Sequence, residues 1–158
     1  MTVYIIDNNL EMLNGMEKIV KEIKNEIDVR PIHYKLDKEK QLKKELKKQL
    51  EIEQLNDAFW LIDLCLEEEQ KKRVPIQELE SIRIVKMLGI VPEHVCFYSN
   101  MYDNGIDVLF SIIEECHFLS VTGSAINVKN YRYNDFQKNR IKYQEKISHY
   151  LFGGELEK

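Results

Sequence analysis

One short run of large apolar residues with a single carboxylate inside it constrains the fold of this chain most. The run extends from Phe59 to Leu66, and an acidic segment at residues 67–69 follows it directly. An uninterrupted apolar run of this length is typical of a strand that is buried on both faces, as in a parallel sheet. Because an unpaired buried charge is costly, we expect Asp63 at the carboxyl end of the strand, where it reaches water or a cation. Asp63 either belongs to a functional site or only caps the turn that follows.

Strands and amphipathic helices alternate along the rest of the chain. Four further strands are predicted, at residues 2–6, 29–36, 94–99 and 118–121, and Pro31 indicates that the second is an edge strand. Apolar residues at helical spacing predict helices that begin after Asn8 or Asn9 and extend to 27, and at 37–56, 75–88, 104–116 and 131–152. The alternation implies a three-layer α/β fold, in which helices cover both faces of a five-stranded parallel sheet with the flavodoxin-like order 2-1-3-4-5.

Composition narrows the class of protein. The 158 residues suit one domain, which we place at 1–153 with the last helix packed on the sheet and a tail at 154–158. With 44% hydrophobic residues, and with no apolar run near the roughly 20 residues that span a bilayer, the chain is predicted to be soluble and not membrane-bound. Three widely spaced cysteines argue against a disulfide framework or a zinc site and predict a cytoplasmic location. The net charge of -4 argues against nucleic acid as a partner.

Polar residues end three of the predicted strands. They are Asp7, Asp63 and Ser99. In the order 2-1-3-4-5, the strands that carry Asp7 and Asp63 are neighbours at the switch point of the sheet, where ligands of such folds bind. Ser99 lies at the end of the next strand. This coincidence favours a functional site over a simple turn cap for Asp63.

These strand ends resemble those of the receiver domain of bacterial two-component response regulators. Residues 3–9 (VYIIDNN) are similar to the family's first strand, which ends in two acids. The segment that begins at Asp63 (DLCL) is similar to the one that begins with the phosphoacceptor aspartate, and residues 97–100 (FYSN) to the strand that ends in Thr or Ser. Phe118 resembles the aromatic switch position on the fifth strand. The resemblance covers about residues 2–128.

The resemblance implies roles for individual residues. Asp63 would accept a phosphoryl group from a histidine kinase, and the Ser99 hydroxyl would bind a phosphoryl oxygen. Asp7, Asn8 and Asp63, together with the backbone carbonyl of Cys65, would hold Mg²⁺. Such an arrangement suits phosphoryl transfer, which depends on positioning and on charge neutralisation by a hard cation.

The chain departs from the family's pattern in ways that leave two functions open. Asn8 replaces the second acid, which predicts a weak Mg²⁺ site, and Val121 stands where the family has a lysine. The first function is a single-domain response regulator that is phosphorylated on Asp63 and binds a partner protein, with no enzymatic activity beyond self-phosphorylation. The second is a pseudo-receiver that is not phosphorylated and serves as a constitutive protein-interaction module. Either form is compatible with a homodimer.

Other classes fit the residues less well. A haloacid-dehalogenase-type phosphatase would need an acid at Asn9, and a flavodoxin would need a phosphate-binding loop rich in Ser, Thr and Gly at residues 8–11. The basic segment 129–146 is interleaved with aromatic residues, as in nucleic-acid binders, but their spacing fits the core face of a helix better. The highly charged segment 37–56 is either a solvated helix on the sheet or a helix that binds a partner.

Overall fold

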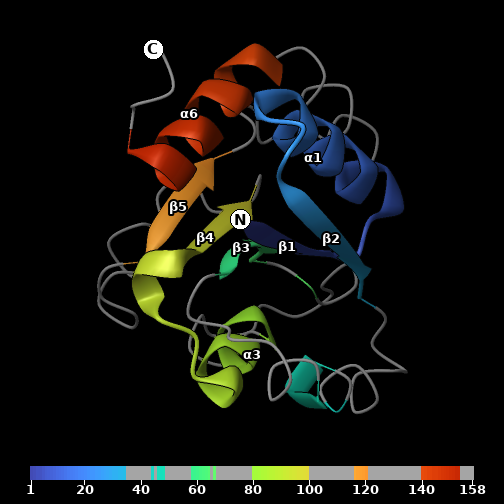
Figure 1. Ribbon diagram of the computed structural model, residues 1–158. Coiled ribbons are helices and arrows are strands. Elements are labelled where there is room, and N and C mark those ends of the chain that lie inside the picture. The colour runs from blue at the N-terminus through green and yellow to red at the C-terminus, as the bar shows by residue number, and fades with distance from the viewer. Residues whose placement is uncertain are drawn as a thin grey trace.

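A five-stranded parallel sheet forms the centre of the structure, a computed structural model (Figure 1). The model describes residues 1–34, 44, 46–48, 58–64, 66, 80–99, 116–120 and 140–153. The sheet has the order β2-β1-β3-β4-β5, and every pairing is parallel, so the predicted order is confirmed. The strands are β1 (Thr2–Asp7), β2 (Asp28–His33), β3 (Ala58–Asp63), β4 (Val95–Ser99) and β5 (His117–Ser120).

Helices cover both faces of the sheet. The α1 helix (Leu10–Ile23) and the α6 helix (Arg140–Phe152) lie on one face, and the α3 helix (Glu80–Leu88) lies on the other (Figure 1). A short 3₁₀ helix, η4 (Pro92–His94), leads into β4. This three-layer arrangement is the predicted α/β fold.

Alternation along the strands divides the core into two clusters. One cluster packs beneath α1 and α6, and its strand residues include Val3, Ile5, Leu61, Cys96 and Tyr98. The other packs against α3, and its strand residues include Tyr4, Ile6, Trp60, Ile62 and Phe97. Because successive strand residues point to opposite faces, the cluster to which a residue belongs shows which face it lies on.

The α1 helix begins as its sequence predicts but ends earlier. Asn9 is its N-cap, and the Asn9 side chain accepts a hydrogen bond from the backbone N–H of Met12 at 3.1 Å. The helix ends at Ile23, so the predicted extension to Ile27 was wrong. Ile27 is nevertheless buried in the same cluster, from the turn before β2. Ile27 continues the helical spacing of apolar residues in the sequence although it lies outside the helix, which explains the wrong prediction.

Glycine ends two of the helices. Gly89 follows α3 with φ of 65°, and Gly153 follows α6 with φ of 63°. This left-handed conformation is open to glycine and strained for other residues, which explains both stops. The predicted helix start at Pro75 and residues 131–139 of the last helix lie outside the described residues. So do most of the predicted helix at 37–56 and nearly all of that at 104–116.

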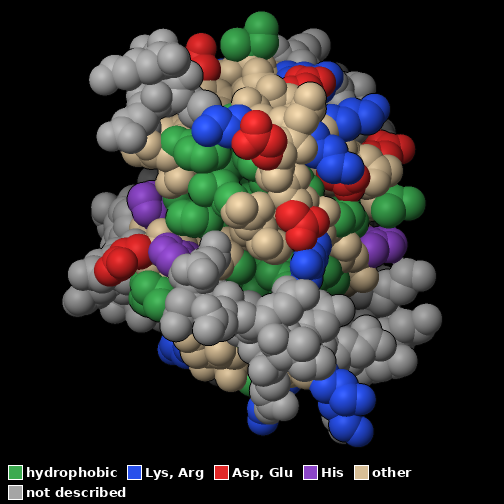
Figure 2. All heavy atoms as spheres, viewed as in Figure 1, with side chains coloured by type: hydrophobic (Ala, Val, Ile, Leu, Met, Phe, Trp, Pro, Cys, Tyr) green, Lys and Arg blue, Asp and Glu red, His purple; other side chains and the backbone are tan. Residues whose placement is uncertain are grey.

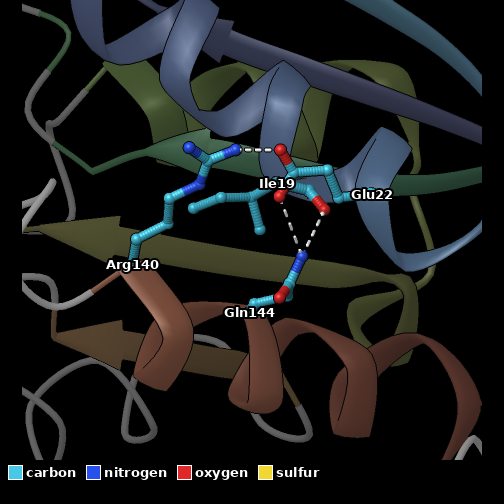
Figure 3. A network of polar contacts seen from close by, with 4 residues as sticks. All are labelled: Ile19, Glu22, Arg140 and Gln144. Atoms are coloured by element: carbon cyan, nitrogen blue, oxygen red, sulfur yellow. Dashed lines mark hydrogen bonds and ion pairs between the residues drawn. The ribbon is translucent and has the colours of Figure 1, made fainter.

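Polar side chains join α6 to α1 at their exposed margin (Figure 3). The Arg140 guanidinium forms an ion pair with the Glu22 carboxylate. The Gln144 amide donates to the backbone carbonyl of Ile19 and to Glu22, each at 3.4 Å. The two helices are thus held in register by contacts between residues more than a hundred positions apart in the sequence.

The surface over α1 and α6 has no single sign of charge. Figure 2 shows Lys and Arg side chains intermixed with Asp and Glu over this part of the molecule. In the described part of the chain, no helix combines the length and hydrophobicity that a membrane span requires.

Candidate functional site

Asp7 and Asp63 end two neighbouring strands at the switch point of the sheet. Ile6 of β1 pairs with Ile62 of β3, so the two aspartates that follow lie at the same level. Parallel neighbours are about 4.8 Å apart, which places the two carboxylates on adjacent backbone positions. Both continue the alternation of Ile5 and Leu61, so they lie on the face that α1 and α6 cover.

We expected Asp63 to reach water or a cation; its burial rules out contact with bulk water, and contact with a cation stays a prediction. Asp63 is the last residue of β3, as predicted, but 0% of its surface is exposed, and the same holds for Asp7. The position at the strand end follows from the sequence. The burial follows from the neighbouring strands and the layers above them, which only the folded chain brings together.

Tyr98 forms the shortest described polar contact of this site. Its hydroxyl donates a hydrogen bond to Oδ2 of Asp7 at 2.6 Å and lies 3.5 Å from the carbonyl oxygen of Ile6. Tyr98 is fully buried, and it pairs in register with Asp63. Because β3 lies between β4 and β1, the Tyr98 side chain crosses the end of β3, where Asp63 lies, to reach Asp7.

Sequence reasoning missed Tyr98, although a signal was present. Tyr98 directly precedes Ser99, so it lies one residue before the polar end of its strand. A buried tyrosine hydroxyl normally finds a hydrogen-bond partner. A tyrosine at the same level as Asp63 therefore could have been assigned to the acidic residues at the strand ends.

The backbone around Asp7 is also fixed. Oδ1 of Asp7 accepts a hydrogen bond from the N–H of Asn9 at 2.8 Å, and the Asp7 carbonyl accepts one from the N–H of Tyr34 at 2.9 Å. The His33 ring nitrogen Nε2 lies 3.1 Å from the Asn8 carbonyl. Asn9 thus caps α1 with its side chain and holds the Asp7 carboxylate with its backbone.

Two hydrogen bonds, one with β4 and one with α3, fix the backbone at Leu64, directly after Asp63. The N–H of Leu64 donates to the Tyr98 carbonyl at 2.9 Å, and the hydroxyl of Ser81 donates to the Leu64 carbonyl at 2.7 Å. Ser81 is fully buried near the start of α3. The first turn of α3 therefore lies against the same end of the sheet as Asp63.

Three of the predicted site residues are only partly covered by the structure. Ser99 is the last residue of β4 and pairs with Ser120, and Phe118 is the second residue of β5. The side chains of Ser99 and Phe118 fall outside the described part, as does all of Cys65. The proposed contacts of these residues with a phosphoryl group or a metal ion therefore stay predictions.

The Asp7 environment is a poor fit for a hydrated Mg²⁺. Each of its carboxylate oxygens already accepts a hydrogen bond, one from Asn9 and one from Tyr98. Mg²⁺ normally keeps several of its water ligands, yet neither Asp7 nor Asp63 exposes any surface for them. Within the described residues, no group of three or more His, Cys, Asp or Glu side chains is arranged to hold a metal ion.

Comparison with solved structures identifies the fold. The crystal structure of a response regulator receiver domain from Rhodospirillum rubrum matches this chain with a TM-score of 0.57 and 13% sequence identity, over 94% of each chain. No family model matches the sequence. No curated protein matches it either. The chain therefore has a receiver-like fold, as its strand ends predicted, while its sequence shares little with that of the matching receiver domain.

Proposed function

We propose that this chain is a receiver-like signalling module that acts by binding a partner protein and is not phosphorylated at an appreciable rate. The observation that carries the proposal is the closed acidic site: Asp7 and Asp63 are fully buried, and Asp7 is bonded to Tyr98. A phosphodonor must approach Asp63 in line and needs a cation to neutralise its charge. The described arrangement supports neither requirement, so the fold would serve as a constitutive binding surface.

A phosphorylated receiver is the second candidate, because one specific observation favours it. Asp63 ends β3 at the switch point, level with Asp7 of the neighbouring strand, which is where the resemblance to receivers puts the phosphoacceptor. In this alternative, a rearrangement opens the site to a histidine kinase or to a small phosphodonor. Ser99 would then contact a phosphoryl oxygen.

The two candidates differ in a direct chemical test. The full chain is incubated with acetyl phosphate and Mg²⁺, and the intact mass is followed over time. The proposal predicts little or no gain of a phosphoryl mass in the wild-type protein. The Asp63→Asn variant is the matched control, since it removes the acceptor oxygen while it keeps the shape of the side chain.

Rapid, stoichiometric addition of one phosphoryl group that is absent from Asp63→Asn would overturn the proposal and establish the second candidate. An unchanged mass in both proteins supports the constitutive module. A receiver known to react under the same conditions serves as the positive control for the reagent.

A further inference from the structure

The geometry points to Tyr98 as the residue that closes the acidic site, its hydroxyl proton taking the position at Asp7 that a cation would otherwise occupy. This inference deepens the proposed function and rests on it. Tyr98 is a positioning residue in this scheme. Its hydrogen bond to Asp7 makes the buried carboxylate stable without a metal ion.

The contact is made across an intervening strand. Tyr98 belongs to β4 and Asp7 belongs to β1, with β3 between them. A side chain that spans three strands must lie over the end of the middle strand, which here is the position of Asp63. The Tyr98 side chain therefore passes at the level of Asp63, and the hydroxyl at its tip bonds to Asp7.

Hydrogen bonds stabilise the negative charge of the buried Asp7 carboxylate, and the Tyr98 hydroxyl donates one of them. A buried carboxylate needs either a cation or hydrogen-bond donors. Oδ1 of Asp7 receives the N–H of Asn9, and Oδ2 receives the Tyr98 hydroxyl at 2.6 Å, a length typical of a hydrogen bond to a charged acceptor. If the hydroxyl is removed, Oδ2 loses this donor while its negative charge stays. A divalent cation would then compensate for the loss.

The test removes the hydroxyl and measures the response to metal. For Tyr98→Phe, we expect millimolar Mg²⁺ to raise the melting temperature and Mn²⁺ to bind about tenfold or more tightly than to the wild type, as loss of one hydrogen bond to a charged group would allow. Binding raises the melting temperature only when the folded state binds the ion. Mn²⁺ binding is measured by its paramagnetic signal and needs no phosphorylation.

A partly buried tyrosine, Tyr150, provides the control. The Tyr150 hydroxyl donates to the Trp60 carbonyl at 3.2 Å, and Tyr150 packs in the same half of the core, away from the acidic residues. Tyr150→Phe should show no gain in metal binding. The double variant Tyr98→Phe with Asp7→Asn should lose the gain, because it removes the negative charge that the ion would bind. Tyr98→Val, which removes the ring as well, is the second variant, because the space it opens can hold the water ligands that an ion keeps.

The outcomes separate this inference from the proposed function. If folded Tyr98→Phe and Tyr98→Val bind Mn²⁺ no better than the wild type, Tyr98 does not close the site, even when the wild type resists phosphorylation. If the wild type already binds Mn²⁺ as tightly as Tyr98→Phe, the inference also fails. A gain that depends on Asp7, in a protein whose wild-type form acetyl phosphate does not modify, supports both.

Discussion

Two buried hydroxyl groups form hydrogen bonds at the ends of β1 and β3. One belongs to Tyr98 and the other to Ser81. Tyr98 bonds to the side chain of Asp7, whereas Ser81 bonds to the backbone just after Asp63. A buried polar atom that loses its partner retains its desolvation cost, so these bonds matter more than exposed ones. The positions of Asp7 and of the backbone after Asp63 thus depend on single atoms of β4 and α3.

Replacement of Ser81 by alanine should destabilise the protein measurably. The Leu64 carbonyl would lose its donor in a buried setting, which typically costs about 1–3 kcal/mol in the free energy of unfolding. Urea denaturation of Ser81→Ala against the wild type measures the loss. Arg83→Ala, at an exposed position of the same helix, is the control. An unchanged unfolding midpoint for Ser81→Ala would show that the bond does not contribute.

The described cysteines are structural thiols. Cys96 and Cys116 are both buried and have free thiols. Burial raises the pKa of the Cys116 thiol to about 11 and raises that of Cys96 as well. A thiol with a raised pKa is protonated at neutral pH and reacts slowly. These two residues therefore contribute packing and not chemistry.

At the scale of the elements, α6 is attached to the sheet chiefly by its buried side chains. Tyr143, Ile147 and Leu151 are its buried residues and belong to the cluster that also holds α1. The ion pair between Arg140 and Glu22 lies at the margin, with side chains 31% and 52% exposed. Solvent screens such a pair strongly, so apolar packing dominates the contact.

This ranking predicts unequal effects of two substitutions on α6. Ile147→Ala should lower the free energy of unfolding by about 2–5 kcal/mol, since it removes a buried branched side chain. Arg140→Ala should lower it by only about 0–1 kcal/mol, as expected for an exposed ion pair. Chemical denaturation of both variants provides the comparison. If Arg140→Ala had the larger effect, the polar contacts of Figure 3 would dominate the attachment of α6.

At the scale of the whole molecule, a half-open pocket of about 360 Å³ lies against α6 and the strands β4 and β5. Its lining combines apolar and titratable side chains: Cys96, His117, Leu119, Glu145, Lys146, Ile147, His149 and Tyr150. The His117 ring lies 4.7 Å from the Tyr150 ring. Partial burial of the ring, and then the neighbouring His149, lower the pKa of His117 below its ordinary value of 6.5.

The lowered pKa of His117 predicts a loss of stability in acid. Just below about pH 6.5, His117 takes up a proton more readily in the unfolded chain than in the folded protein, so the free energy of unfolding falls as the pH falls through this range. His117→Gln should reduce this loss. His149→Gln should reduce it in part, because it removes the second cause of the shift.

Urea midpoints measured between about pH 7.5 and pH 5.5, a range that brackets the ordinary histidine pKa, test this expectation. His33→Gln, at the opposite edge of the sheet, is the control for replacement of a strand histidine. If His117→Gln followed the same pH dependence as the wild type, the packing of β5 against α6 would not respond to His117.

The sequence alone determined the order of elements and the parallel sheet. Periodicity of two and of three to four residues is a local property of a chain, and the alternation of strands and helices leaves few ways to build a sheet. Three further features followed from this local information. They are the edge position of the strand that contains Pro31, the placement of Asp7 and Asp63 at strand ends, and the end of α3 before Gly89.

Only the tertiary structure decided how the acidic strand ends are closed. Tyr98 and Asp7 are separated by 91 positions, and the sequence places Tyr98 near the end of its strand without showing that its side chain crosses β3 to reach β1. The end of α1 at Ile23 was decided in the same way, because Ile27 is buried from a turn as readily as from a helix. Hydrophobic patterns record that a residue is buried, whereas the partner of a buried polar atom depends on which distant residues the fold brings beside it.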